Sequence, residues 1–140
     1  MSYLFDTTVL IGYFHRQKES ETYIAKIMDG ILQASISSVT IAEVYSGIRR
    51  DDISRIDQTE AILSFFQIED VTDEIAKEGG KLFNAYRHQM GQKCIDDKGP
   101  LLDAMIAATA KIRKMILTTN NYCHFKPMED DGHIKCEKIP

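Results

Sequence analysis

Short apolar runs alternate with longer amphipathic stretches along the chain. The apolar runs are bounded by polar or turn-forming residues, which is typical of strands in a buried parallel sheet. The longer stretches repeat apolar residues at intervals of three and four, which predicts helices packed by one face. Strands are predicted over residues 3–5, 33–37, 67–71, 115–118 and 134–139. Helices are predicted over residues 9–14, 20–31, 40–50, 51–65, 72–90 and 100–110, with a polar loop at 92–99.

This alternation predicts an α/β fold. Parallel neighbours need long crossovers, so helices should cover both faces of a central parallel sheet of about five strands in three α/β/α layers. A chain of 140 residues fits a single domain, residues 1–140. Such sheets place their chemistry at the carboxyl ends of the strands. Asp6 and Asn121 each follow a predicted strand, so they become neighbours if the first and fourth strands pair.

Composition narrows the class of protein. Hydrophobic residues make up 44% and charged residues 27% of the chain, which is ordinary globular usage. No apolar run approaches the roughly 18 residues of a membrane helix, so we expect a cytoplasmic protein with no membrane contact. Three widely spaced cysteines argue against a disulfide framework and a zinc site. The net charge of −4 argues against coating nucleic acid by bulk charge, but it is compatible with a nuclease whose carboxylates hold metal ions.

Four polar residues stand at predicted element boundaries, and each has a purely structural explanation. Asp6 can cap the helix that follows it, and Glu43 can be the capping-box partner of Thr40. Asp103 can be an acid in the first turn of its helix, where its negative charge interacts favourably with the helix dipole. Asn121 can be a turn residue. Taken singly, none of them requires a functional role.

Taken together, Asp6, Glu43, Asp103 and Asn121 supply three carboxylates and an amide. Oxygen ligands of this kind suit hard divalent cations such as Mg²⁺ or Mn²⁺. Like charges in one crevice repel each other, and a bound cation would remove that penalty. The four residues are therefore candidate metal ligands.

The segments around these residues resemble the motifs of one family in order and spacing. The segments are Asp6-Thr-Thr-Val-Leu-Ile, Ser38-Val-Thr-Ile-Ala-Glu43-Val-Tyr-Ser-Gly47, Leu101-Leu-Asp103-Ala-Met-Ile-Ala-Ala-Thr-Ala and Leu117-Thr-Thr119-Asn-Asn121-Tyr-Cys-His-Phe125. They are similar to the motifs of the PIN-domain ribonucleases, and most closely to those of VapC-type toxins from prokaryotic toxin–antitoxin pairs. The resemblance spans nearly the whole chain and implies a PIN-like fold.

The resemblance also implies roles for individual residues. Asp6, Glu43 and Asp103 would be catalytic and metal-binding carboxylates, and Asn121 stands where the family often carries a fourth Asp. An amide can bind through its carbonyl oxygen but brings no charge. Thr8 falls where the family often has a small polar residue near the metal, although a turn hydroxyl explains it equally well. His124 replaces an Asp that is common before the closing Phe, and no role is predicted for it.

The activity implied by the resemblance is hydrolysis of RNA phosphodiesters by an endoribonuclease dependent on Mg²⁺ or Mn²⁺. A small antitoxin and a second copy of the chain, forming a homodimer, would be its partners. Arg49, Arg50 and Arg87 are candidates for guiding the substrate phosphates. The alternative for these arginines is a solvated charged face.

Three other functions compete with this one. The first is a PIN-domain nuclease of RNA processing that has no antitoxin. The second is a non-catalytic PIN scaffold that binds RNA, which the uncharged Asn121 favours. The third is a phosphoacceptor receiver domain with Asp6 in its acidic pocket and Asp70 as the acceptor, which would leave the helix around Asp103 unexplained.

Overall fold

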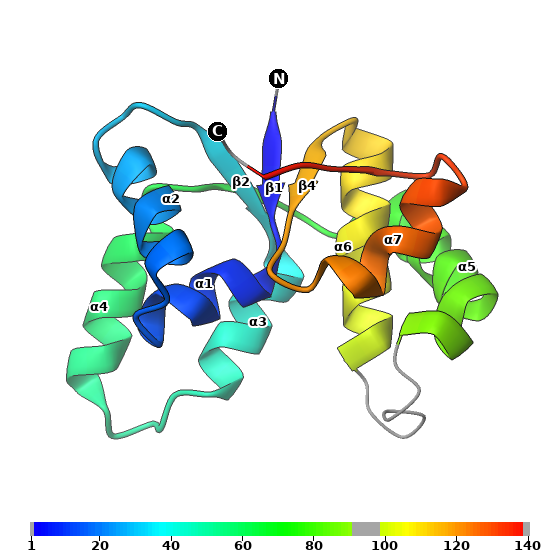
Figure 1. The fold of residues 1–140 in the computed structure, drawn as a ribbon. Helices are drawn as coiled ribbons and strands as arrows, with labels where there is room; N and C mark the ends of the chain where they lie inside the picture. The colour runs from blue at the N-terminus through cyan, green and yellow to red at the C-terminus, as the bar shows by residue number, and fades with distance from the viewer. Residues whose placement is uncertain (1, 91–98, 139–140) are drawn as a thin grey trace.

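The structure, a computed structural model that describes residues 2–90 and 99–138, has a central parallel sheet in the strand order β3-β2-β1-β4-β5 (Figure 1). The strands are β1 (Tyr3–Phe5), β2 (Ala34–Ser37), β3 (Gln67–Glu69), β4 (Ile116–Thr118) and β5 (Lys135–Cys136). The first strand pairs with both β2 and β4, with Phe5 opposite Ile36 on one side and Thr118 on the other. Strand order therefore reverses at β1, the position where open α/β sheets form a crevice at their carboxyl edge.

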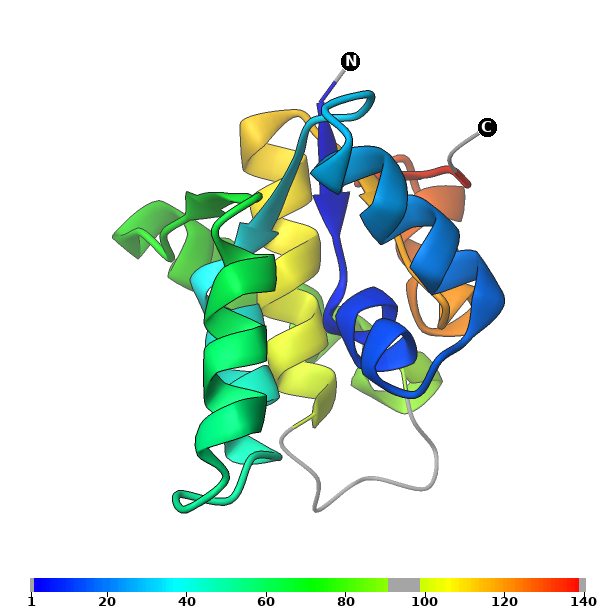
Figure 2. The same ribbon diagram turned by 90° about the vertical axis from the view of Figure 1, so that its left-hand side faces the viewer.

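Helices cover both faces of this sheet. They are α1 (Thr7–Phe14), α2 (Lys18–Met28), α3 (Ser38–Ser46), α4 (Ile53–Leu63), α5 (Asp73–Met90), α6 (Gly99–Arg113) and α7 (Tyr122–Asp130). The first four lie on one side and the last three on the other (Figure 1). In both views the arrowheads of β1 and β2 point toward the starts of α1 and α3 (Figures 1 and 2). The predicted three-layer α/β/α fold with a five-stranded parallel sheet is confirmed.

Each face of the sheet has its own hydrophobic core, because successive residues of a strand point in opposite directions. Leu4 packs in the core formed with α5, α6 and α7, whereas the adjacent Phe5 packs in the core formed with α1, α2 and α4. Both side chains are fully buried. The strand that carries Asp6 at its end is thus held from both sides.

Helix α6 packs closely because its buried residues are small. Ala104, Ala107 and Ala108 are fully buried. A Cβ atom placed on Gly79 of α5 would lie 3.0 Å from Met105 Cγ, so α5 also approaches α6 tightly. The close packing of α6 fixes the position of Asp103 relative to the sheet.

Several predicted boundaries were wrong. Helix α3 begins after Ser37, whose hydroxyl accepts a hydrogen bond from the Val39 backbone N–H (3.1 Å), and it ends at Ser46 rather than at residue 50. Helix α7 was not predicted, because Pro127 lies inside it. The helical pattern over residues 51–65 also predicts that Ile53 is buried, but this side chain is 62% exposed. The predicted loop at 92–99 lies outside the described residues except for Gly99, which begins α6.

Within the described residues, none of the helices combines the length and the apolar character needed to cross a membrane.

Candidate active site

Asp6 lies at the carboxyl end of β1 and is only 1% exposed. It occupies the N-cap position of α1, but its side chain makes no capping hydrogen bond. Instead, its Oδ2 accepts hydrogen bonds from the hydroxyls of Thr8 and Thr119, both at 2.8 Å. Asp6 is thus the N-cap residue by position, but side-chain capping does not account for its carboxylate, which is oriented by hydroxyls from two separate segments.

The second carboxylate oxygen of Asp6, Oδ1, is the polar atom of the site that is least compensated. Asp6 Oδ1 is buried and has no hydrogen-bond partner. Burial raises the pKa of this carboxyl, whereas the hydroxyls of Thr8 and Thr119 and the backbone N–H groups of Thr7 and Thr8 lower it by a smaller amount. A buried carboxylate oxygen without a partner is costly, and the usual compensation is a cation or a proton. This oxygen is suited to bind a cation.

Glu43 projects from α3 and is held by the start of α1. The Thr7 hydroxyl donates to Glu43 Oε1 at 2.6 Å and lies 3.0 Å from Thr40 Oγ1. Thr40 is buried inside α3, which is capped by Ser37. The predicted capping box of Thr40 and Glu43 is therefore wrong, and the Glu43 carboxylate is held beside the residue that follows Asp6.

Asp103 lies on α6, opposite the first turn of α7. Because α6 begins at Gly99, Asp103 falls beyond its first turn, so the helix-dipole explanation does not hold. The Nδ1 atom of His124 lies 3.3 Å from Asp103 Oδ2 and 3.4 Å from Asn121 Nδ2. His124 was given no role from the sequence. Its position three residues after Asn121 puts both on one face of α7, a signal that was missed together with the helix.

Hydrogen bonds join the two sides of the site. The Asn121 backbone N–H donates to Thr119 Oγ1 (2.9 Å), and the Thr119 hydroxyl donates to Asp6. Together with the peptide link between Asp6 and Thr7 and the two contacts of His124 Nδ1, these bonds place all four predicted ligands on one continuous path. The path runs from Glu43 through Thr7, Asp6, Thr119, Asn121 and His124 to Asp103.

Among residues 2–90 and 99–138, no three His, Cys, Asp or Glu side chains lie close enough together to hold one metal ion. The unpartnered, buried Asp6 Oδ1 and the oxygen-rich donor set nevertheless fit a hard divalent cation. Binding one ion would require side chains on the path to rotate toward it.

Thr8 and Asn120 join the start of α1 to the turn that follows β4. Thr8 donates to Asp6, and its Oγ1 accepts the Asn120 backbone N–H at 3.0 Å. The Asn120 side chain donates to Thr8 O (3.1 Å) and to Ser20 Oγ (3.0 Å). A Cβ atom on Gly12 would lie 2.4 Å from Ser20 Oγ and 2.9 Å from Asn120 Nδ2, so this contact requires glycine. Asn120 was not recognised from the sequence, because its partners come from distant segments.

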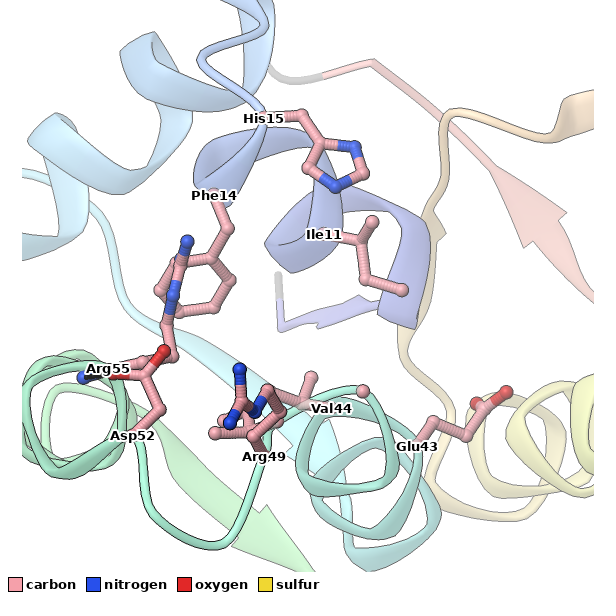
Figure 3. Close-up of a pocket in the computed structure, with 10 residues that line it drawn as sticks. Ile11, Phe14, His15, Glu43, Val44, Arg49, Asp52 and Arg55 are labelled. Carbon is pink, nitrogen blue, oxygen red and sulfur yellow. Dashed lines mark hydrogen bonds between the residues drawn. The ribbon is translucent and has the colours of Figure 1, made fainter.

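A cavity of about 330 Å³ opens beside Glu43, between α1 and the α3–α4 connection (Figure 3). Arg55 stacks over the Phe14 ring with its guanidinium carbon 4.8 Å from the ring centre. Arg49 also lines the cavity and pairs with Asp51 at 2.9 Å. The cavity is lined by Ile11, Phe14, His15, Glu43, Val44, Gly47, Ile48, Arg49, Asp52 and Arg55.

The three arginines predicted to guide phosphates differ in their position relative to the cavity. Arg49 lies with Glu43 at the cavity. Arg50 and Arg87 are exposed and do not line it. Arg55, which the sequence did not single out, takes a place beside Arg49 because helix α4 turns it toward Phe14.

Comparison with known proteins identifies the family. The model of the PIN domain matches residues 3–126, so the chain belongs to the PIN-domain family, as the motifs indicated. Ribonuclease VapC19 from Mycobacterium tuberculosis is 30% identical over 128 residues, which cover 91% of this chain and 94% of the relative. Ribonuclease VapC10 from the same species is 28% identical over 127 residues, 90% of this chain and 87% of the relative.

Solved structures agree with this assignment. A toxin–antitoxin complex from Klebsiella pneumoniae contains a chain with a TM-score of 0.69 and 26% identity, and the match covers 98% of this chain and 99% of that one. VapBC2 from Rickettsia felis, bound to a DNA fragment from its promoter, matches with a TM-score of 0.73 and 19% identity over the full length of both chains. At that identity, the second match shows the shared fold.

Proposed function

We propose that this chain is a metal-dependent endoribonuclease, a single PIN domain that serves as the toxin of a VapBC-type toxin–antitoxin pair. The observation that carries the proposal is the buried, unpartnered Oδ1 of Asp6 at the point where strand order reverses. The ribonuclease names of the M. tuberculosis relatives support it.

In this proposal, Asp6, Glu43, Asp103 and Asn121 hold Mg²⁺ or Mn²⁺. Such an ion, when bound, lowers the pKa of a water molecule and neutralises phosphate charge. The protein's own residues prepare the site. Thr8 and Thr119 fix the Asp6 carboxylate so that Oδ1 stays available, and Thr7 holds Glu43 in place.

Substrate would approach along the cavity beside Glu43. Arg49 lines this cavity and is positioned to meet the phosphates of an RNA strand, and Arg55 adds a second positive charge. We assign Arg50 and Arg87 a weaker role, because exposed charges away from a site act mainly on encounter.

An antitoxin and a second copy of the chain are the proposed protein partners. The antitoxin is supported by the similarity to the chain of the K. pneumoniae toxin–antitoxin complex. A PIN nuclease of RNA processing would have the same site without this partner, so co-purification of a small protein encoded beside this one distinguishes the two.

The decisive experiment incubates the purified protein with transfer, ribosomal and messenger RNA. Cleavage is expected with Mg²⁺ or Mn²⁺ and should stop on addition of EDTA. Asp6→Asn should be inactive, whereas Asp29→Asn, the same change at an exposed carboxylate after α2, should be fully active. RNA binding without cleavage by the wild-type protein would instead indicate a non-catalytic scaffold. Cleavage by Asp6→Asn at the wild-type rate would refute the assigned site.

A further inference from the structure

His124 brings a nitrogen donor into a site otherwise built from oxygen ligands. It lies on the first turn of α7, and its side chain is 32% exposed beside the 18% exposed Asp103. Its Nδ1 faces two groups at once, the Asp103 carboxylate at 3.3 Å and the Asn121 amide at 3.4 Å. None of the functional assignments above uses this imidazole.

The three side chains lie near enough to share one ion after the Asn121 amide turns. Neighbouring ligands of an octahedral ion with bonds of about 2.1 Å lie about 3 Å apart. The distance from His124 Nδ1 to Asp103 Oδ2 is 3.3 Å, close to this value, and the Asn121 amide lies beside the same nitrogen with its Nδ2 at 3.4 Å. An imidazole nitrogen, a carboxylate oxygen and an amide that can turn its oxygen inward are all neutral or anionic donors, so a cation among them satisfies all three.

The two neighbours also make conflicting demands on His124 when no cation is present. The Asp103 carboxylate accepts hydrogen bonds, so it calls for a proton on Nδ1, whereas the Asn121 NH₂ group donates and calls for a lone pair there. One nitrogen cannot meet both demands. A turn of the Asn121 amide, which would present its oxygen to a protonated Nδ1, removes the conflict. A cation also removes it, because it takes the lone pair of Nδ1 and an oxygen from each neighbour.

We propose that His124 is a ligand of the divalent ion and that this nitrogen makes the site prefer Mn²⁺ over Mg²⁺. The inference rests on the proposed function, in which the cluster holds such an ion. Mg²⁺ is a hard cation that favours oxygen ligands and retains its waters, whereas first-row transition ions accept imidazole more readily. Asn121 brings no charge, so a neutral nitrogen beside it shifts the donor set further from what Mg²⁺ prefers.

The test measures Mn²⁺ itself. Loss of the free-ion electron paramagnetic resonance signal gives the Mn²⁺ affinity, and competition with Mg²⁺ gives the ratio of the two affinities. Electron spin echo modulation of bound Mn²⁺ reports a directly bonded ¹⁴N. The wild-type protein should show this nitrogen coupling. His124→Gln should lose it and lower the Mn²⁺/Mg²⁺ affinity ratio, because imidazole is the donor that Mn²⁺ accepts more readily.

The control is His88→Gln, which changes an exposed histidine on α5 and should retain both the coupling and the ratio. If His124→Gln fails to fold, His124→Asn replaces it. Bound Mn²⁺ without nitrogen coupling in the wild type, or coupling that persists in the His124 variant, overturns the role of His124 and leaves the metal site intact. A wild-type protein that binds no Mn²⁺ overturns both proposals.

Discussion

Asp6 and Asp103 both face the carboxyl edge of the sheet, but the protein holds them by different means. Asp6 is 1% exposed, follows a strand buried between two cores, and is fixed by hydroxyls from Thr8 and Thr119. Asp103 is more open to solvent, and its contact with His124 is a longer one between two helices, at 3.3 Å. One carboxylate is fully buried, and the other is partly buried.

The difference shows how a single site can combine a fixed part and an adaptable part. Burial of Asp6 imposes an electrostatic cost that only a cation or a proton relieves. The Asp103 side chain is in partial contact with solvent and is held by a longer contact, so it can adjust toward an ion or a substrate at lower cost than Asp6. Activity should depend on both residues, but stability should respond differently to each.

The largest effect is expected from Asp6→Asn and Asp103→Asn. Loss of a group that merely supports a metal ligand costs about 10- to 100-fold, so loss of a ligand itself should reduce RNA cleavage more than about a hundredfold in either variant. In EDTA, Asp6→Asn should melt at or above the wild-type temperature, because a buried charge is removed. Asp103→Asn should not gain stability. A similar gain in both variants, measured by thermal melting, would contradict the contrast between them.

A smaller loss is expected from Thr119→Val, which keeps the side-chain shape but removes the hydroxyl that joins Asp6 to Asn121. RNA cleavage and Mn²⁺ affinity should fall about 10- to 100-fold, the effect typical of a group that orients a ligand.

The matched control for this change is Thr118→Val. The Thr118 hydroxyl is on the adjacent residue but donates to Glu137 O, away from Asp6. The Thr118→Val variant should therefore have the Mn²⁺ affinity of the wild-type protein. If the two valine variants behave alike, the loss reflects damage to β4 rather than to the orientation of Asp6.

The stability of the metal-free protein should depend on pH through Asp6. Burial raises the pKa of Asp6 in the folded state above its ordinary value of 3.8. The stability contributed by this group is therefore fully present below pH 3.8 and is lost as pH rises through the folded-state pKa. Urea unfolding in EDTA should show the wild type losing stability relative to Asp6→Asn over this range. A constant difference between the two proteins would mean that burial does not perturb Asp6.

The smallest effect is expected from Arg50→Gln, which removes an exposed charge outside the cavity. An exposed charge contributes at most about 1 kcal/mol, so KM for RNA should rise no more than about fivefold with kcat unchanged. Lys114→Gln, at an exposed lysine before β4 and thus near the amino edge of the sheet, is the control and should change neither constant. A change in kcat for Arg50→Gln would place this residue at the reacting groups.

The sequence by itself determined the fold class and supplied the candidate site residues. Alternating strands and helices predicted a parallel sheet covered on both faces, and the resemblance in four motifs predicted Asp6, Glu43, Asp103 and Asn121 as the site residues. These features are readable because hydrophobic periodicity and motif spacing are local properties of the chain.

Only the tertiary structure decided what the polar groups do. Thr40 and Glu43 have capping-box spacing, yet Ser37 caps α3 and Glu43 instead accepts a hydrogen bond from Thr7, 36 residues away in sequence. Asp6 stands at an N-cap position but is oriented by Thr119, 113 residues away. His124 lies beside Asp103 only because it belongs to α7, a helix that was not predicted because it contains Pro127. A side chain chooses among donors and acceptors within about 3 Å, and only the folded sheet determines which distant residues come within that range.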